Sequence, residues 1–435
     1  MKKPISRFYL LLVLVPLLLL ASMGGYYFLE ETAAGSDVVV VPQTPAPPSA
    51  TPVPVPTPEP TPTPFPEHDI TLMAVGDNLM HLGIVASGKQ EDGTYDFSML
   101  FQGISPFLNA ADIRIINQET VMGGNSRGFS GFPYFNSPTE VGDAIADVGF
   151  NVVLQASNHT ADQKLDGLLY CADFWKNKHP EVVVTGIHED ASQADDIPLL
   201  TIDDVTFAIL NYTYGANTET LPLDLLGHLN LLCAVNEKNG QMDFTTLNPQ
   251  VLEDISRAKE LADIVIVCPH WGTEYVYEPN AAQRRFASRL VEAGVDAIIG
   301  THPHVLQPVE LMHRPDGRRV PVFWSLGNLI SRQMEAPRTV GGLAGLTVEK
   351  IGDGCAITSC SIQPTVMHKT SRPDTEMRVY RLADYSDELA GGNNVETTED
   401  FPSFTVASCH DFASKVLGAS YDRASSSLLL EVNPL

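Results

Sequence analysis

Basic residues are scarce in this chain, which has 27 lysines and arginines against 53 aspartates and glutamates over 435 residues. The formal net charge is -26. Because nucleic acids are bound mainly through basic surface, this balance argues against nucleic acid as a partner. A phosphate-bearing substrate would need a local cation to offset the acidic field, and a bound metal ion would supply one.

Cysteine is also infrequent, with 6 residues in the whole chain. Their spacing is not that of a zinc ribbon. None precedes Cys171, which argues against lipoprotein attachment near the amino terminus. We interpret Cys171 and Cys268 as buried core residues. Cys355 and Cys360 could pair across a hairpin, since an exported chain permits disulfides.

Charge is absent from Phe8 to Leu29, directly after Lys2, Lys3 and Arg7. As a helix, this apolar run is long enough to cross a bilayer core of about 30 Å. The basic residues before it predict a cytoplasmic amino terminus and an extracellular remainder. We therefore expect residues 1–30 to be a retained single-pass membrane anchor; a cleaved signal peptide is the alternative.

The segment 31–66 is rich in proline, and 12 of the 25 residues from Pro42 to Pro66 are proline. Such a segment cannot form a packed core. It predicts a semi-rigid polyproline spacer of roughly 75 Å, at about 3.1 Å per residue. We expect a globular domain, starting near Glu67, that is held away from a membrane.

Downstream of Glu67, short apolar runs alternate with helical patterns, which is typical of an α/β domain. The predicted strands lie at 70–75, 112–117, 150–156, 181–186, 206–212, 263–268, 295–300 and 321–326. The predicted helices lie at 140–149, 166–178, 249–262 and 281–294.

Glycines mark the ends of two of these helices. Gly149 and Gly294 each follow a helical pattern and precede a strand, where a glycine in the left-handed conformation is expected. After about residue 370 the alternation weakens and ends in a short strand-like stretch at 426–432. We therefore expect residues 371–435 to be a peripheral elaboration of a domain that spans 67–370.

Side chains that can bind metals follow five of the predicted strands. The carboxyl ends of strands in an α/β sheet line one edge, where ligands bind, so we expect these side chains to converge. They are Asp77 and His81 after the first strand, Glu119 after the second, Asn158 and His159 after the third, His270 and Glu274 after the 263–268 run, and His302 and His304 after the 295–300 run. Asn328 follows the 321–326 run in the same way.

This mixture of carboxylate, imidazole and carboxamide groups suits Mn²⁺, Zn²⁺ or Fe better than Ca²⁺. In the stretch GTHPH, the single residue between His302 and His304 lets the two imidazoles reach different ions, about 3.5–4 Å apart. Two-metal sites of this kind clamp the oxygens of a phosphoryl displacement and lower the pKa of bound water. The sequence therefore predicts a site for one or two divalent ions, with His159 as a general acid or phosphate contact.

Five further residues are candidates for support of the ligands or for substrate contact. His81, Glu274 and Asn328 either hold the ligands in place or belong to ordinary loops. The glycine-rich loop 123–138 either approaches a ligand with its backbone or is a mobile surface loop. In that loop, Arg127 could pair with an anionic group, and Asn136 is the fifth candidate.

The motifs AVGDNLMH, NQET, FNSP, SNHTADQKLDGL, HWGTEY, GTHPHVLQPVE and WSLGNLI occur in this order from about Ile70 to Ile330. In these motifs the chain resembles the CapA family, whose members are associated with synthesis and export of poly-γ-glutamate capsule. That family is similar to calcineurin-like metallophosphoesterases, whose fold packs two mixed β-sheets between helical layers. The resemblance implies this fold for the chain, after a transmembrane helix and a proline-rich stalk.

The resemblance also implies a role for each matched residue. Asp77 is implied as the aspartate ligand of the first strand, and Glu119 as the carboxylate that bridges two ions. Asn158, His270, His302 and His304 are implied as further ligands, and His159 as the catalytic histidine. On this mapping Glu119, Asn158, His270 and His302 hold one ion, while Asp77, Glu119 and His304 hold the other.

Two positions depart from the phosphoesterase pattern. Leu79 stands where those enzymes carry a histidine in their first motif, and the bridging aspartate is replaced by the longer Glu119. His81, two residues after Leu79, is a candidate substitute. Both departures leave open a site with one ion, or a binding site descended from an enzyme.

Three functions follow as hypotheses. The first is an extracellular, membrane-anchored, metal-dependent hydrolase of phosphoesters that acts in capsule biosynthesis. The second is a non-catalytic component of a capsule synthase or export complex, which holds an anionic polymer in the same cleft. The third is an extracellular amide or γ-glutamyl hydrolase, because water activated by a metal also attacks amides.

Overall fold

The computed structural model describes residues 69–352, 354–370 and 377–433. The predicted anchor at 1–30 and the predicted proline-rich linker at 31–66 lie outside these residues. Within them, no helix combines the length and the apolar character needed to cross a bilayer.

The predicted strands and helices are confirmed, with small shifts at their ends. The helices are α2 (Leu82–Ser87), α3 (Ser105–Leu108), α4 (Glu140–Val148), α5 (Lys164–Lys178), α6 (Pro249–Leu261), α7 (Ala281–Ala293), α8 (Asp387–Gly392) and α9 (Val406–Leu417). Gly149 and Gly294 follow α4 and α7 in the left-handed conformation, with φ of 100° and 101°. Their backbone N–H groups bond to carbonyls of the last helical turn, which ends both helices as predicted.

The strands form two mixed sheets and a separate hairpin. They are β1 (Ile70–Asn78), β2 (Ile113–Gln118), β3 (Val152–Leu154), β4 (Val183–Thr185), β5 (Leu199–Ile202), β6 (Val205–Thr213), β7 (Cys233–Val235), β8 (Met242–Leu247), β9 (Ile264–His270), β10 (Ala297–Ile299), β11 (Val309–His313), β12 (Arg319–Phe323), β13 (Asn328–Ile330), β14 (Val340–Ile351), β15 (Gly354–Lys369), β16 (Met377–Arg381), β17 (Tyr421–Asp422) and β18 (Ser427–Glu431). The mixed α/β class predicted from the sequence is therefore correct.

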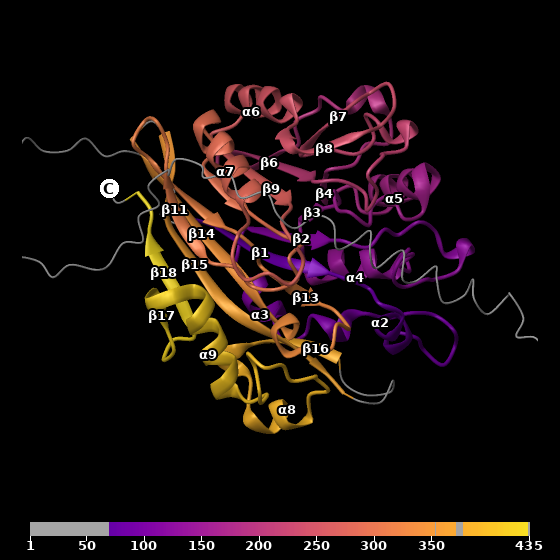
Figure 1. Cartoon of the computed structure of the whole chain (residues 1–435), viewed down its shortest axis with the longest axis vertical. Helices are drawn as coiled ribbons and strands as arrows, with labels where there is room; N and C mark the ends of the chain where they lie inside the picture. The colour runs from indigo at the N-terminus through magenta and orange to yellow at the C-terminus, as the bar shows by residue number, and fades with distance from the viewer. Residues whose placement is uncertain (1–68, 353, 371–376, 434–435) are drawn as a thin grey trace, which may run out of the picture. The chain divides into compact units, whose positions relative to one another are not determined.

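The larger sheet has ten strands in the order β17-β18-β15-β14-β1-β2-β3-β4, with β13 beside β1 and β16 beside β15. Strands β1 to β4 are parallel, whereas β14 pairs with β1 in the antiparallel direction. The smaller sheet has six strands in the order β11-β12-β10-β9-β6-β5. Its central strands β6, β9, β10 and β12 are parallel. Figure 1 shows α6 and α7 beside this sheet.

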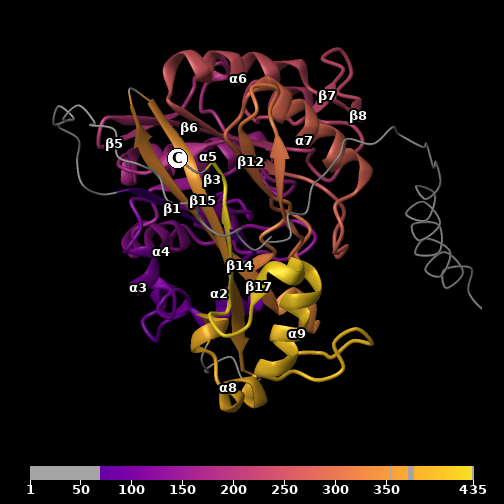
Figure 2. The same cartoon turned by 90° about the vertical axis from the view of Figure 1, so that its left-hand side faces the viewer.

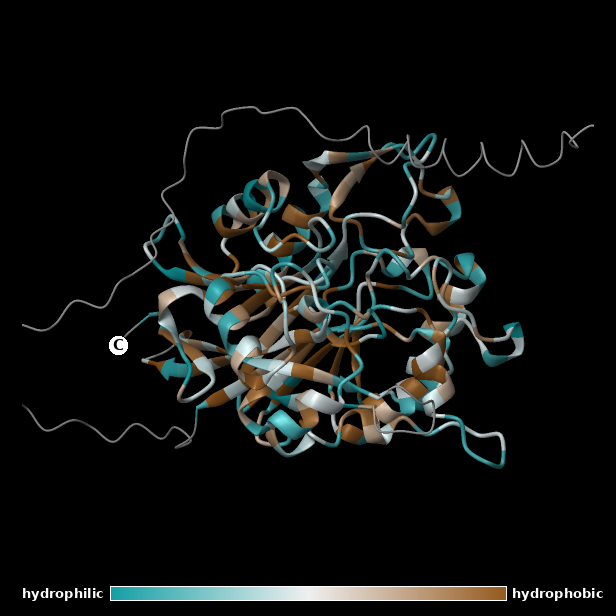
Figure 3. Ribbon diagram, turned by 60° about the horizontal axis from the view of Figure 1, so that its bottom comes forward, coloured by the Kyte–Doolittle hydropathy of each residue, from teal (hydrophilic) through white to brown (hydrophobic). Residues whose placement is uncertain are grey.

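Alternate residues of each sheet belong to two different buried clusters. Leu72 and Ala74 of β1 share one cluster with Ile209 of β6 and Ile266 of β9, which joins the facing surfaces of the two sheets. Val75 of β1 belongs to the other cluster, together with apolar residues of α4 to α7. Figure 3 shows the resulting pattern, with hydrophobic strands at the centre and mixed helices outside them. Burial on both faces explains why these strands are nearly continuous apolar runs.

Residues 377–433 contribute edge strands to the ten-stranded sheet and the helices α8 and α9. Strands β16 and β18 both pair with β15, so they extend the ten-stranded sheet. Figure 2 shows the C-terminal strand β18, in yellow, beside the orange β15. The strand-like pattern at 426–432 is confirmed as β18. Cys355 and Cys360 both lie on β15 and are free thiols, so they do not bridge a hairpin. Cys171 and Cys268 are buried, as predicted.

Candidate metal centre

The metal-binding side chains predicted from the sequence meet where parallel strands of both sheets end. Three strand ends come from the larger sheet and two from the smaller one, rather than all five from the edge of one sheet. Asp77 lies in β1, Glu119 follows β2, Asn158 and His159 follow β3, His270 ends β9, and His302 and His304 follow β10. All seven side chains are buried.

Glu119 lies at the centre of this group. Both of its carboxylate oxygens are buried without a hydrogen-bond partner. Oε1 of Glu119 lies 3.7 Å from Nε2 of His304, 3.9 Å from Nε2 of His270 and 4.0 Å from Nε2 of His159. Burial raises the pKa of Glu119 well above its ordinary value. A buried carboxylate without donors is costly, and a cation between these atoms would compensate for it.

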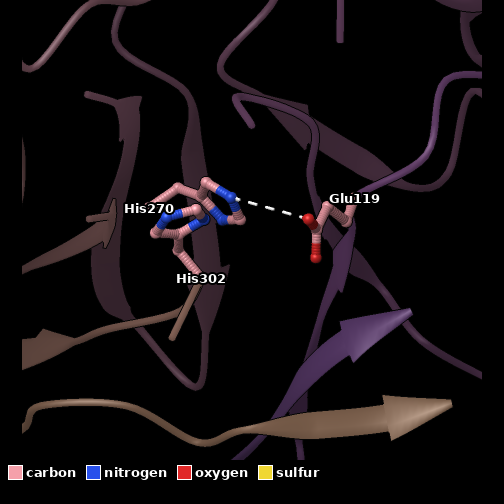
Figure 4. A group of neighbouring side chains, drawn as sticks. All are labelled: Glu119, His270 and His302. Carbon is pink, nitrogen blue, oxygen red and sulfur yellow. Dashed lines mark ion pairs between the residues drawn. The ribbon is translucent and has the colours of Figure 1, made fainter. Parts of the chain in front are cut away.

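Three overlapping triads place their donor atoms within 4.8 Å of one another. They are Glu119, His270 and His302; Asp77, Glu119 and His304; and Glu274, His302 and His304. Figure 4 shows the imidazoles of His270 and His302 side by side, with the carboxylate of Glu119 facing His270. Oδ1 of Asn158 lies 2.8 Å from Nε2 of His270, so the carboxamide extends the first triad to four donors. Oxygen and imidazole donors in this arrangement fit Mn²⁺, Zn²⁺ or Fe.

Burial sets the protonation of two of the imidazoles. It lowers the pKa of His270 and of His302 well below the ordinary value, so both rings are neutral, as metal ligands must be. His304 differs. Burial lowers its pKa, but the charges of Glu119 and Asp77 outweigh that effect and raise it to about 9. An ion bound by His304 would therefore displace a proton from the ring at neutral pH.

The GTHPH segment has an uncommon backbone. His302 and His304 have φ of 99° and 59°, in the left-handed region that non-glycine residues rarely occupy. Such residues cost about 1–3 kcal/mol each and persist where the surrounding structure requires them. Here the backbone turns both imidazoles of the pair toward Glu119.

A carboxylate and a carboxamide orient the His304 ring. Nδ1 of His304 donates to Oδ2 of Asp77 at 3.0 Å and to Oδ1 of Asn328 at 3.1 Å. Nε2 is thereby left to face Glu119. Asp77 is held in turn by Nδ2 of Asn117, at 2.8 Å from its Oδ1. Asn328 therefore supports a ligand from β13, which pairs with β1 at Asp77.

His159 is oriented by a different carboxylate. Its Nδ1 donates to Oδ2 of Asp162 at 2.8 Å, so Nε2 is the atom that faces the site. Oδ2 of Asp162 also accepts from the backbone N–H of Phe135, at 2.7 Å. The Phe135 ring packs edge-on against His159 on one side and His81 on the other. These contacts fix the orientation of the His159 ring, which the sequence analysis predicts to be a general acid or phosphate contact.

The remaining sequence candidates lie in different places. His81 caps the start of α2 and packs against Phe135, and burial lowers its pKa to about 4. Asn136 uses its amide to brace its own loop through the backbone of Gly123, Gly124 and Gly128. Arg127 is exposed on a short 3₁₀ turn. Glu274 is exposed at the rim and belongs to the third triad.

Leu79, at the position of the missing histidine, is a buried apolar residue. Its backbone N–H donates to the carbonyl of Ile330 at 2.8 Å. An apolar side chain has no lone pair for an ion. The second donor set therefore consists of Asp77, Glu119 and His304 unless another residue joins it.

Sequence reasoning missed the segment after β6. Nδ2 of Asn158 donates to Oδ1 of Asn217 at 2.9 Å, and the ring of Tyr214 lies 4.8 Å from the ring of His302. Asn217 has φ of 53° and comes directly after the stretch TYGA. The signal was a strand at 206–212 followed by polar residues, the same pattern that identified the other strand ends.

Comparison with known proteins gives one family. Residues 71–333 match the family described as "Bacterial capsule synthesis protein PGA_cap". The chain is 28% identical over 273 residues to "Capsule biosynthesis protein CapA" of Bacillus anthracis, covering 61% of this chain and 60% of that protein. It is 28% identical over 259 residues to "PGA biosynthesis protein CapA" of Bacillus subtilis (strain 168), covering 59% and 62%. The chain thus matches less than two thirds of the length of either relative.

Among solved structures, the chain is similar to the calcineurin-like phosphoesterase YfkN of Bacillus subtilis. That similarity has a TM-score of 0.35 and 12% identity, and it covers 80% of this chain and 97% of the other. The family match spans more than half of the chain and contains every residue of the centre described above. The chain belongs to the bacterial capsule synthesis protein PGA_cap family.

Proposed function

We propose that this protein is a metal-dependent hydrolase of the calcineurin-like phosphoesterase type that acts in poly-γ-glutamate capsule biosynthesis. The observation that carries this proposal is Glu119, a fully buried carboxylate with no hydrogen-bond donor, surrounded by three imidazole nitrogens at 3.7 to 4.0 Å. Protein interiors rarely bury a carboxylate this way without a cation. The names of the two relatives supply the cellular process.

A divalent ion held by these residues would polarise a phosphoryl oxygen and make bound water more acidic. The protein's own residues then orient the reaction. The donors around Glu119 hold the ion, and the left-handed backbone of GTHPH keeps both imidazoles in place. His159, fixed through Nδ1 by Asp162, would deliver a proton to the leaving oxygen from Nε2 of its imidazolium form, which leaves the neutral ring with its proton on Nδ1.

The ion is Mn²⁺, Zn²⁺ or Fe, in one or two copies. The set of Glu119, Asn158, His270 and His302 has four donors and binds the first ion. The set of Asp77, Glu119 and His304 binds the second more weakly, because Leu79 contributes no donor. Hydrolysis with one ion is therefore compatible with the proposal.

The setting that we propose is the outer face of the cell membrane. Residues 1–30 anchor the chain in a single pass, and residues 31–66 hold the metal-binding domain away from the bilayer. The substrate is a phosphoester or an anionic polymer, and the partners belong to a capsule polymer synthase or export complex. Nucleic acid is not among the partners, given the net charge of -26.

The test uses the purified full-length chain, its metal content and a panel of phosphomonoesters and phosphodiesters. The double variant Asn158→Ala, His302→Ala should lose both bound metal and hydrolysis. Glu278→Gln, an exposed carboxylate away from the triads, serves as the matched control. Hydrolysis by the double variant at the rate of the unmodified protein would refute the proposal.

Leu79 favours a second candidate, a non-catalytic role in which the site holds an anionic chain during capsule assembly. A metal set that lacks a donor can retain binding after loss of catalysis. In that case His159→Ala preserves capsule production in cells, whereas deletion of residues 1–30 abolishes it. Capsule production that follows measured hydrolysis across a series of variants would exclude this candidate.

A further inference from the structure

Glu274 lies at the rim of the metal centre, in the loop between β9 and α7. One of its carboxylate oxygens lies within 4.8 Å of ring nitrogens of both His302 and His304. Glu274 is thus an exposed side chain within reach of the histidine pair, which contributes one member to each donor set.

The Glu274 loop is tied to the histidine pair by the next residue. The backbone N–H of Tyr275 donates to the carbonyl of Pro303, between the two histidines, at 2.8 Å. The Tyr275 ring lies 5.9 Å from the ring of His304. The guanidinium of Arg338 lies over the Tyr275 ring, 3.5 Å from its centroid. The backbone of Tyr275 therefore holds the neighbouring Glu274 beside the histidines.

The two donor sets differ in the number of residues that can bind an ion. Glu119, Asn158, His270 and His302 form a set of four, whereas Asp77, Glu119 and His304 form a set of three because Leu79 has no donor atom. In addition, Nδ1 of His302 is buried without a hydrogen-bond partner in the same triad as Glu274. The second set thus has one donor fewer than the first, and Glu274 lies within reach of its imidazole, His304.

We propose that Glu274 is the fourth protein ligand of the second ion and replaces the histidine that Leu79 displaced. This inference rests on the metal centre of the proposed function. The completed set has three carboxylates and one imidazole, a harder set than the first one. It favours Mn²⁺ over Zn²⁺.

The experiment measures Mn²⁺ binding to the metal-free full-length chain by equilibrium dialysis. The unmodified protein should bind two ions, and Glu274→Gln should bind the second at least about tenfold more weakly while the first is unchanged. Paramagnetic resonance gives a second readout, because two neighbouring Mn²⁺ ions show a coupled signal and a single ion shows the isolated one. Glu278→Gln, an exposed carboxylate in the same loop, is the control and should keep two ions.

A charge-preserving variant separates ligation from general attraction. Glu274→Asp keeps the negative charge but shortens the side chain by one methylene, so it should also weaken the second ion. Normal affinity in Glu274→Asp or in Glu274→Gln, or a single ion in the unmodified protein, overturns the inference.

The outcomes remain distinct from those that test the proposed function. Glu274→Gln could lose the second ion while the unmodified protein hydrolyses none of the phosphoesters. This result would support Glu274 as a ligand and refute the proposed hydrolase. Hydrolysis by an unmodified protein that binds a single ion would support the proposed function and overturn Glu274 as a ligand.

Discussion

Asn217 accepts a hydrogen bond from Nδ2 of Asn158 at 2.9 Å, although the two residues come from loops of different sheets. Nδ2 of Asn217 returns a hydrogen bond to the backbone carbonyl of Asn158 at 3.2 Å. This reciprocal pair turns Oδ1 of Asn158 toward His270. The orientation of a ligand is therefore set by a residue that offers no ligand atom.

Replacing Asn217 should weaken the first ion without removing any ligand. We expect Asn217→Ala to lower metal affinity about 10- to 100-fold, the usual effect of losing a partner that orients a ligand. Asn217→Asp keeps the acceptor for Nδ2 of Asn158 and should retain most of the affinity. Titration calorimetry with Mn²⁺ checks both, and Thr218→Ala, exposed in the same loop, is the control. Equal affinity in Asn217→Ala and the unmodified chain would contradict the role.

Replacing Glu119 should abolish stabilisation by metal. An ion at 100 times its dissociation constant adds about 2.7 kcal/mol to the free energy of unfolding of the unmodified protein. Glu119→Gln removes the shared carboxylate and should show no such gain. Glutamine, unlike Glu119, does not have to take up a proton to be buried in a neutral form, so the metal-free variant should melt at or above the temperature of the metal-free unmodified protein. Thermal unfolding with and without Mn²⁺ measures both effects, and a normal metal-induced shift in the variant would contradict the central position of Glu119.

Lys369 should make stability depend on pH in the alkaline range. Its Nζ is buried and donates to the carbonyl of Gln333 at 2.7 Å and to Oγ1 of Thr339 at 3.0 Å. Burial lowers the pKa of Lys369 to about 7 from 10.5. Between these values the unfolded chain binds more protons than the folded one, so the free energy of unfolding rises with pH.

The rise from Lys369 has an upper limit of about 1.4 kcal/mol per pH unit. Lys369→Met should lack it, so the difference in unfolding free energy between the two proteins should widen in favour of the unmodified chain from pH 7 to pH 10. Urea denaturation at a series of pH values measures this difference. A constant difference would show that Lys369 keeps its charge when folded.

Gly76→Ala should destabilise the fold and displace Asp77. A Cβ at Gly76 would lie 1.9 Å from the carbonyl oxygen of Gly327, which also accepts from the backbone N–H of Asp77 at 2.9 Å. Backbone cannot move aside cheaply, so we expect a loss of about 3 kcal/mol. Gly391→Ala in α8, where nothing lies within 4 Å of the new Cβ, should be neutral or gain up to about 1 kcal/mol. Chemical denaturation of both variants tests this contrast.

The strands and helices that carry the site were predictable because their signals are local. An apolar run such as 263–268, buried on both faces, marks a parallel strand without knowledge of its neighbours. A glycine such as Gly294 ends a helix through its own backbone conformation. The ligands were predictable for a related reason, since each directly follows or ends a strand.

The strands of the antiparallel half, β14 to β16, escaped prediction. Val340–Ile351 contains three polar or charged residues and three glycines, which obscures the pattern of a strand. Gly341 and Gly342 lie where a side chain would meet the backbone of Asn328 and the side chain of Ile362. These two glycines are needed because β14 packs closely against residues that are distant in the sequence or on another strand. A local sequence pattern does not encode such packing.

The sequence by itself determined the α/β class, the strand ends and the kinds of donor atoms available for a metal. Only the tertiary structure decided that these strand ends come from two sheets, that Glu119 is buried without a donor, and that Asn217, Asp162 and Glu274 adjoin the ligands. The physical reason is the distance along the chain over which each effect acts. Backbone conformation and apolar periodicity act over a few residues, whereas distance, desolvation and the orientation of a side chain also depend on groups that are far apart in the sequence, such as Asp77 and His304.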